Sequence, residues 1–463
     1  MSLFSAFFQI LSYKYKWNPD LMNSDATFSP LFTDLYELTM MAAYRENHMT
    51  ANATFSLFIR GYEQLNRGYF IAAGLQDALR SLEQLRFSQE EIEYLQHLNL
   101  FPGSFIRTLP DFRFTGDVWA MPEGTICFSD EPLMEVTAPI AEAQLVETFL
   151  INIIGFQTNI ATKAARCIHA AKGRPIVDFS LRRTQGLDAG MQVARSTYIA
   201  GFSGTSNVLA ARRYDIPVSG TMAHSFVLAF CNDGDAFQAY ARTFPDDSVF
   251  LIDTRHVLQG AHDAVNIAKI MAENGHRLKG VRIDSGDMVE SSRQVRHILD
   301  EAGLQQVRVI ATSGFDEYKI EKTLASGAAI DAFGVGANIG VSSDSPFLDV
   351  VYKMVRYHDR DVRKISPGKT TLAGEKQVFR RMDASGSPKE DIIACRNEVI
   401  EGAVPLLEKV MTNGRCKHPL PSLAQIRAKI QSSLSAIDQR YTLLQQPARY
   451  PVHLSRNLSA LQL

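Results

Sequence analysis

Cysteine is scarce in this chain and follows no pattern. The 463 residues include five cysteines, an odd number. No CxxC spacing links them, since they stand at Cys127, Cys167, Cys231, Cys395 and Cys416. This scatter argues against a metal site built from cysteine and predicts a reduced, cytoplasmic setting.

An excess of charge and a long hydrophobic run are also missing. Lysine plus arginine number 48 against 50 acidic residues, a net charge of −2, so no general basic field is available for nucleic acid or an anionic membrane. The apolar stretches are too short for a membrane span. In MSLFSAFFQILSYKYKW the lysines follow the apolar run, which is not the order of a signal peptide. Residues 1–29 are predicted to be an N-terminal extension, with Met22 as an alternative initiator.

From about residue 175 the chain alternates apolar, β-branched runs with helix-like segments. With 46% hydrophobic residues it can bury a large core, and continuous apolar strands followed by helices predict a parallel sheet. So many units suggest closure into an irregular α/β barrel. The expected strands are Pro175–Phe179, Tyr198–Phe202, Ile216–Val218, Val249–Ile252, Gly280–Ile283, Val307–Ala311 and Ala329–Val335.

The two ends of the chain have a different pattern. Antiparallel-looking runs at Phe112–Glu123 and Leu133–Val136 are mixed with helical segments. We expect residues 30–165 and 351–463 to form one accessory α+β domain, and residues 166–350 to form the barrel that carries the active site.

His224 is the first candidate for catalysis. It stands in IPVSGTMAHSFVLAF, between a strand-like run and a second apolar stretch, where a strand end of an α/β protein opens into a cleft. The alternative is a histidine that caps a helix or packs in the core.

The turns after the expected strands hold groups that bind anions. Arg182 and Arg183 offer guanidinium groups for bidentate contact with phosphate, and Gly334 and Gly336 would let backbone N–H groups approach closely. Each signal has a structural alternative, a solvated arginine pair or a simple turn. Their expected location on one face of the barrel favours binding.

The segment GVRIDSGD adds Arg282, Asp284 and Asp287 at the end of another strand. A carboxylate there could contact ribose hydroxyls or a magnesium ion that bridges phosphates. Asp287 could equally cap the following helix. Arg282 lies within the strand, where a buried arginine requires an anion from the protein or from a substrate.

Six blocks together resemble nicotinate phosphoribosyltransferase, in the order of that family. They are DLYELTM at 34–40, DFSLRRTQG at 178–186, GFSGTSNVLA at 201–210, SGTMAHSF at 219–226, VRIDSGD at 281–287 and SPGKTTLAGEKQVFR at 366–380. The resemblance implies the type II phosphoribosyltransferase fold. It also implies a reaction in NAD salvage, in which nicotinate and phosphoribosyl diphosphate give nicotinate mononucleotide and diphosphate.

The resemblance further implies coupling to ATP hydrolysis, with Mg²⁺ as cofactor. By position, His224 matches the family histidine that becomes phosphorylated. Imidazole is a nucleophile at neutral pH, which is consistent with this role. The magnesium ligands are not assigned.

For the nicotinate ring, the resemblance places Tyr36 and Phe179 on its two faces. Arg282 and Thr221 match positions that contact nicotinate, so the substrate would supply the carboxylate that Arg282 requires. In the family the tyrosine comes from the neighbouring subunit, which implies a homodimer with a shared active site.

For the sugar phosphate, the resemblance implies that Arg182 contacts an anion, that Asp284 contacts the ribose, and that the turns at Gly314 and Gly334–Asn338 bind the 5′-phosphate. In the second turn these residues include Gly336, Ala337 and Asn338. Ala337 replaces a threonine found in many relatives, so it offers only its backbone N–H. Arg255 and His256 also depart from the family pattern and receive no role.

Two other functions stay open at this point. One is a nicotinamide phosphoribosyltransferase, in which an aspartate would accept a hydrogen bond from the amide at the position of Ser206; the neutral serine removes a charge that would repel nicotinate and so favours the acid. The other is a non-catalytic barrel that binds a phosphorylated sugar. That alternative would be favoured by loss of His224 or of the arginine pair, and both are present.

Overall fold

The computed structural model describes residues 28–61, 66–366, 370–417 and 419–463. Most of the predicted N-terminal extension, residues 1–29, therefore lies outside the described residues. No helix in these ranges is both long and apolar enough to cross a membrane.

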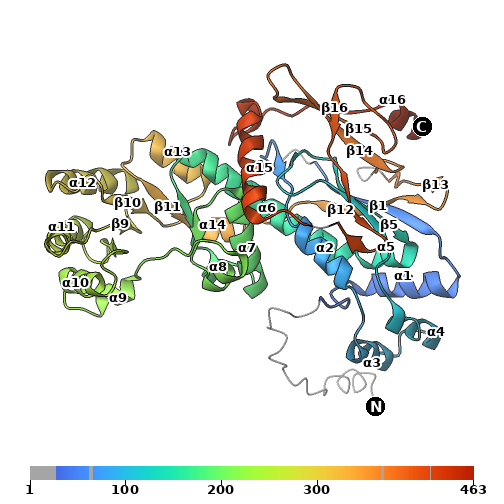
Figure 1. Cartoon of the computed structure of the whole chain (residues 1–463), viewed down its shortest axis with the longest axis horizontal. Helices are drawn as coiled ribbons and strands as arrows, with labels where there is room; N and C mark the ends of the chain where they lie inside the picture. Colours follow the sequence, from blue (N-terminus) through green and yellow to red (C-terminus); the bar gives the residue numbers. More distant parts are fainter. Residues whose placement is uncertain (1–27, 62–65, 367–369, 418) are drawn as a thin grey trace, which may run out of the picture.

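A six-stranded parallel sheet forms one side of the molecule (Figure 1). Its spatial order is β7 (Gly204–Thr205), β6 (Ile176–Asp178), β11 (Ala332–Val335), β10 (Arg308–Ala311), β9 (Gly280–Ile283) and β8 (Val249–Leu251). Every neighbouring pair in it is parallel. The covering and connecting helices are α7 (Leu187–Ala200), α8 (Val208–Tyr214), α9 (His224–Leu228), α10 (Asp233–Thr243), α11 (Val257–Glu273), α12 (Met288–Glu301), α13 (Glu317–Ala325) and α14 (Ala337–Gly340).

The predicted irregular α/β barrel is confirmed, as a curled sheet that does not close. β7 and β8 are the two edge strands of the sheet. At the β7 edge, Val218 forms one further parallel bridge, to Thr205. The chain crosses the gap between these edges as a long loop from α8 to α9 (Figure 1). We call the last part of this loop, residues 219–223, the crossing loop, and it leads directly into His224 at the start of α9.

Two predicted strands are wrong. Ile216–Val218 forms only the single bridge at Val218, since Pro217 has no N–H to donate to a ladder. The other, Tyr198–Phe202, begins with the last three residues of α7, which ends at Ala200 and is capped by Gly201 with φ at 125°. Most side chains of this helix from Val193 onward are buried. The segment therefore lacks the regularly spaced polar residues that identify a surface helix in a sequence. The strand of this unit is β7, two residues further on.

Both ends of the chain contribute strands to a second, antiparallel sheet. Its order is β13 (Arg360–Asp361), β12 (Val350–Tyr357), β1 (Asn52–Ile59), β5 (Pro132–Pro139), β3 (Asp117–Ala120), β17 (Glu408–Thr412) and β18 (Arg415–Cys416). A four-stranded sheet holds β16 (Ala403–Pro405), β14 (Lys376–Met382), β15 (Pro388–Cys395) and β19 (Val452–Leu454), and β2 (Phe70–Ile71) pairs with β4 (Ile126–Cys127). The domain boundaries at 165 and 350 stay predictions.

Helix α6 (Glu147–Ala171) runs between the two parts of the molecule (Figure 1). Its first turns, at Phe149 and Leu150, are buried in the core under the antiparallel sheet. Its last turns, from Ala161 to Ala171, are buried in the core of the half-barrel. The remaining helices are α1 (Leu35–Glu46), α2 (Leu75–Gln84), α3 (Gln89–His97), α4 (Gly103–Ile106), α5 (Ile140–Leu145), α15 (Leu423–Ala436) and α16 (Arg456–Leu461).

Candidate active site

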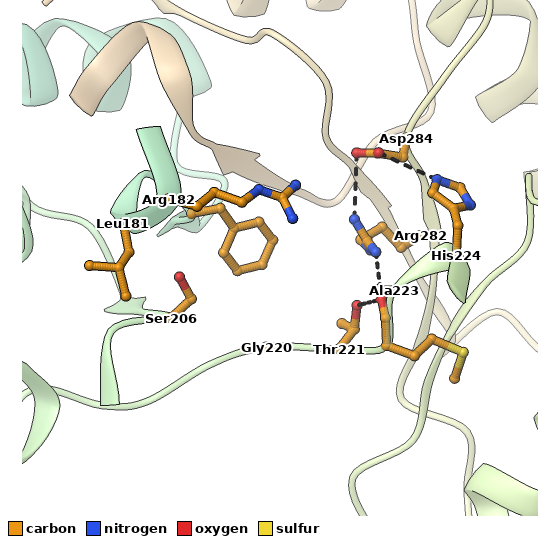
Figure 2. A pocket seen from close by; sticks show the side chains of 11 residues that line it. Leu181, Arg182, Ser206, Gly220, Thr221, Ala223, His224, Arg282 and Asp284 are labelled. Carbon is orange, nitrogen blue, oxygen red and sulfur yellow. Dashed lines mark hydrogen bonds and ion pairs between the residues drawn. The ribbon is translucent and has the colours of Figure 1, made fainter. Parts of the chain in front are cut away.

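A pocket of about 360 Å³ opens at the carboxyl ends of β6, β7 and β9 (Figure 2). The crossing loop forms another part of its wall. Ligands of parallel α/β sheets bind at this edge because the loops there are free to vary. The lining residues are Phe179, Leu181, Arg182, Ser206, Gly220, Thr221, Met222, Ala223, His224, Arg282 and Asp284.

Phe179 is held in the wall by the strand that precedes it. Its N–H donates to the carbonyl of Val335 over 2.8 Å. The buried carboxylate of Asp178 accepts from Ser180 N at 2.9 Å and from Thr205 Oγ1 at 2.7 Å. Burial raises the pKa of Asp178 above its ordinary value. The bond from Thr205 joins β6 to β7, the bond to Val335 joins the end of β6 to β11, and together they fix the backbone that carries the phenyl ring.

Gly334 makes room for that ring. A Cβ atom built on this residue would come within 2.6 Å of Phe179 Cδ2 and of Thr312 Cγ2. Carbon atoms this close repel strongly, so a larger residue would displace the ring or the strand. The sequence assigned Gly334 to a phosphate turn, whereas the structure shows a packing requirement.

Arg282 projects from β9 into the pocket with most of its side chain buried. Its Nη2 donates to the Met222 carbonyl over 2.7 Å, and its Nη1 donates to Thr312 Oγ1 over 3.2 Å. Asp284 is the paired carboxylate, at 3.5 Å from Nη1, too far for a strong charge-assisted bond. Burial lowers the pKa of Arg282 although Asp284 and Asp253 oppose this.

One N–H of Arg282, at Nε, is buried and has no partner among the described residues. A desolvated guanidinium with a weak carboxylate partner favours binding of a further anion. Arg182, on the turn after β6, points toward the same space as Arg282 in Figure 2. The pocket therefore suits an anionic ligand that lies between two arginines.

His224 is the first residue of α9, opposite the wall that holds Ser206 and Leu181 (Figure 2). Its Nδ1 lies 3.1 Å from Thr254 Oγ1, and its Nε2 lies 3.5 Å from Asp284 Oδ2. Its side chain is 40% exposed, so a ligand can reach the ring. The alternative of a core histidine is therefore not supported.

Asp284 is itself held by two neighbouring strand ends. Its N–H donates to Asp253 Oδ2 over 2.9 Å, and its side chain accepts a short hydrogen bond from Thr312 Oγ1. Asp253, Thr254 and Thr312 support the site but were not selected from the sequence. Asp253 and Thr254 lie in the turn DTRHV, in which Arg255 and His256 depart from the family pattern.

Three other residues that the sequence analysis considered lie outside the pocket. Arg255 pairs with the buried Asp233 and donates to the Phe230 carbonyl, which is a structural role. Asp287 caps α12 by accepting from Val289 N and Glu290 N. Arg183 is exposed and does not line the pocket.

The two turns expected to hold the 5′-phosphate lie together. Asn338 Nδ2 donates to the carbonyl of Gly314 over 3.0 Å. Gly314 has a φ of 62° and the preceding Ser313 a φ of 91°, a left-handed turn that glycine adopts without strain. Gly336 and Ala337 stand at the start of α14. None of these residues is part of the pocket wall.

Tyr36 does not reach the pocket of its own chain. It lies on α1, in the part of the molecule that contains the antiparallel sheet (Figure 1), and 46% of its side chain is exposed. Within the described ranges, no group of three or more His, Cys, Asp or Glu side chains is arranged to hold a metal ion.

The half-barrel and its pocket define the class of protein. Two arginines, one carboxylate and glycine-containing turns at the strand ends are the features of an α/β barrel that binds a phosphorylated, anionic ligand. The chain belongs to the nicotinate phosphoribosyltransferase family. Family models match residues 31–155 as the N-terminal domain, 175–362 as the family core and 401–462 as the C-terminal domain.

Individual relatives agree with the family models. The chain is 45% identical to nicotinate phosphoribosyltransferase pncB2 of Mycobacterium tuberculosis, over 92% of this chain and 91% of the relative. It is 39% identical to the nicotinate phosphoribosyltransferase of Bacillus subtilis, over 92% and 93%. The crystal structure of the human nicotinic acid phosphoribosyltransferase superposes with a TM-score of 0.83 at 28% identity, covering 93% of this chain and 99% of that one.

Proposed function

We infer that this chain is a nicotinate phosphoribosyltransferase of NAD salvage. It joins nicotinate to 5-phosphoribosyl 1-diphosphate and releases nicotinate mononucleotide and diphosphate. Membership of the family supports this assignment. The observation in the pocket that carries it is Arg282, a buried cation with one N–H that has no partner in the described part of the chain and with its paired carboxylate 3.5 Å away.

In this proposal the pyridine ring of nicotinate lies against Phe179, and its carboxylate accepts hydrogen bonds from Arg282 and Thr221. All three residues line the same pocket. Ser206 lines it too and adds no negative charge, whereas an aspartate there would repel a carboxylate. Arg282 thus favours the acid over the amide by attracting its carboxylate, and Ser206 allows the acid to bind because it adds no charge that would repel it.

The sugar phosphate would enter beside the base. Arg182 would contact the diphosphate, Asp284 the ribose hydroxyls, and the turns at Gly314 and Gly336–Asn338 the 5′-phosphate. These turns present backbone N–H groups, which suit phosphate oxygens. Ala337 would contribute its N–H alone, and Asn338 already connects the two turns.

The chemistry is a displacement at the anomeric carbon of the ribose. The ring nitrogen of nicotinate forms the new C–N bond with its free lone pair, and the C–O bond to diphosphate breaks with its electron pair leaving on oxygen. No proton moves, so no general base is required. Positive charge that develops on the sugar is balanced by the leaving diphosphate and by the carboxylate of Asp284, while Arg182 stabilises the departing charge.

We propose as the coupling step that the free ring nitrogen of His224 takes the γ-phosphoryl group of ATP, so that ADP leaves with the electron pair of the broken P–O bond, and that water later releases the group as phosphate. The exposed ring and the Thr254 contact at Nδ1 support this, because a hydrogen bond at one nitrogen sets the lone pair on the other. Bound Mg²⁺ would neutralise diphosphate charge. Asp284 offers a suitable oxygen ligand, and magnesium commonly uses one or two carboxylates together with substrate phosphates.

The proposal extends to the oligomeric state and the cellular location of the enzyme. We propose a homodimer in which Tyr36 of one subunit completes the pocket of the other. A cytoplasmic location is supported by the five cysteines, all of which are free.

Product formation from nicotinate and from nicotinamide tests the function directly. Each base is incubated with phosphoribosyl diphosphate and magnesium, with and without ATP, and the mononucleotides are separated by chromatography. We expect nicotinate mononucleotide alone, with more of it when ATP is present. Turnover of nicotinamide would contradict the roles of Ser206 and Arg282, and no product from either base would favour a barrel that only binds phosphorylated sugars.

A further inference from the structure

A group of charged side chains, buried except for the partly exposed Asp344, lies next to the two turns expected to hold the 5′-phosphate. We name it the α6 ionic cluster, and it consists of Arg67, Lys163, Arg166, Glu317 and Asp344. Lys163 Nζ lies 2.8 Å from Glu317 Oε2 and 2.6 Å from Asp344 Oδ1. The side chains of Lys163 and Glu317 are fully buried, and that of Arg166 almost so. None of the five lines the pocket, so the proposed reaction does not use them directly.

The cluster fastens both phosphate turns to helix α6. Glu317 follows Asp316, the residue that ends the first turn and caps α13. It accepts hydrogen bonds from two residues of α6, Lys163 and Arg166. The first turn is therefore tied to the helix through one carboxylate.

The second turn is tied indirectly, through the segment that follows α14 and holds Ser342 and Asp344, because Ser343 N in that segment donates to the carbonyl of Asn338 over 3.1 Å. Arg67 Nη2 donates to Ser342 Oγ over 3.1 Å and to Asp344 Oδ1 over 3.3 Å. Asn159 of α6 accepts from the Ser342 hydroxyl and donates to the Ser345 carbonyl. Ser342 has a φ of 45°, which a residue with a side chain adopts only when its surroundings fix it.

The charges of the cluster do not cancel. Three cations face two carboxylates, and three of their N–H groups, Arg67 Nε, Arg67 Nη1 and Arg166 Nη1, have no partner among the described residues. Partial burial alone would raise the pKa of Asp344, yet Arg67 and Lys163 lower it, so this carboxylate is ionised at neutral pH. A surplus of buried positive charge is costly, and a dianionic phosphate on the adjacent turns would offset part of that cost.

We propose that the α6 ionic cluster positions the two turns for the 5′-phosphate, and that Asp344 is the positioning residue that holds the second turn on Lys163 and Arg67. This inference rests on the proposed function for the assignment of the turns to phosphate. It makes the affinity for the sugar phosphate depend on side chains that do not touch it. Contacts of this kind act through the geometry of the elements that they join.

Asp344→Asn tests the inference because it keeps the size of the side chain and removes its charge. We expect the KM for phosphoribosyl diphosphate to rise about tenfold, while kcat and the KM for nicotinate change less than about twofold. Asp344→Glu keeps the charge and should recover most of the affinity. A matched control is Asp349→Asn, which breaks the ion pair with Arg60 at 2.9 Å in the same connection between α14 and β12 and should leave all three constants unchanged.

A second measurement does not depend on catalysis. Ribose 5-phosphate, which carries the 5′-phosphate without diphosphate, is titrated into each purified variant by calorimetry, and thermal melting confirms that each variant is folded. We expect binding to the wild type and to Asp349→Asn, and binding about tenfold weaker to Asp344→Asn. Unchanged binding by Asp344→Asn, equal losses in both variants, or no binding to the wild type would overturn the inference. If the wild type forms no mononucleotide while Asp344→Asn alone binds ribose 5-phosphate weakly, the proposed function fails and the positioning role stands.

Discussion

At the scale of single residues, Arg282 is the residue that we propose selects the base. Its guanidinium is buried and its nearest carboxylate oxygen is 3.5 Å away, so the charge is available to a ligand. Replacement Arg282→Ala removes this charge-assisted contact, which is worth about 2–5 kcal/mol when buried. We expect the KM for nicotinate to rise far more than that for phosphoribosyl diphosphate in steady-state kinetics with each substrate varied.

The control for Arg282 is Arg183→Ala. Arg183 is exposed and does not line the pocket, so both KM values should stay near those of the wild type. An equal rise of both KM values in Arg282→Ala would indicate loss of the fold and contradict a role in reading the carboxylate.

His224 and Thr254 form the second residue-scale unit. If His224 carries the phosphoryl group, His224→Ala abolishes ATP hydrolysis and labelling from γ-labelled ATP, and slow transfer without ATP remains. Thr254→Val keeps the shape but removes the 3.1 Å contact at Nδ1, and we expect ATP hydrolysis to fall about tenfold, the usual weight of one hydrogen bond.

The exposed neighbour His256 supplies the comparison for this pair. His256→Ala should hydrolyse ATP at the normal rate, because the His256 side chain is not among the residues that line the pocket. Undiminished ATP hydrolysis in His224→Ala would exclude the phosphohistidine.

At the scale of elements, helix α1 contains a buried carboxyl group beside Tyr36. Glu37 is fully buried and accepts hydrogen bonds from Thr148 N and from the N–H of Asp34. Burial raises its pKa from 4.5 to about 7, and the charge of Glu147 adds to this while the hydrogen bonds oppose it. The position of α1 thus depends on a group that titrates near neutral pH.

This carboxyl group predicts a loss of stability as the pH rises. The folded state binds the proton of Glu37 more tightly than the unfolded state, so its contribution is complete below pH 4.5 and is lost as the pH passes about 7. We expect Glu37→Gln, which cannot ionise, to reduce the fall in the free energy of unfolding between pH 5 and 8 by about 1–3 kcal/mol. Urea unfolding at both pH values measures it.

The exposed Glu90 of α3 provides the matched variant for the pH experiment. Glu90→Gln should have the same pH dependence as the wild type. If Glu37→Gln also keeps the full dependence, the buried carboxyl of α1 is not its source.

At the scale of the whole molecule, the start of α1 leaves apolar side chains in solvent. Phe32, Leu35 and Tyr36 are 51%, 54% and 46% exposed, on the part of the molecule that does not contain the pocket (Figure 1). An exposed apolar group of this kind suits a protein interface. It supports the proposal that Tyr36 acts in a neighbouring subunit.

Mixing two impaired variants, at a nicotinate concentration too low for either to turn over alone, tests the shared site. Tyr36→Ala and Arg282→Ala are co-expressed with different tags, and the doubly tagged dimers are assayed for nicotinate mononucleotide. If Tyr36 serves the partner's pocket, one of the two sites in each mixed dimer has both residues intact, so about half of the wild-type activity per dimer returns. Activity no higher than that of the single variants would mean that each site uses its own Tyr36 or that the chains do not pair.

Much of the pocket was predictable because its residues follow strands with a clear apolar pattern. Phe179, Arg182, Ser206, Thr221, His224, Arg282 and Asp284 all line one cavity, as expected for the carboxyl ends of parallel strands. Thr254 and Thr312 were not predicted. Threonine is common at strand ends, and only the folded structure brings these two hydroxyl groups to His224 and Asp284. The mistaken strand at 198–202 had a similar cause, because a helix buried on most sides loses the spacing that marks a helix.

The sequence by itself determined the βα rhythm, the family and the residues that face the pocket, because these depend on local pattern and on order along the chain. Only the tertiary structure decided that the barrel stays open between Val218 and β8. It also decided that Gly334 accommodates Phe179, and that Lys163 meets both Glu317 and Asp344. Such contacts join residues more than a hundred positions apart, and their energies depend on distances and burial that arise only when the chain has folded.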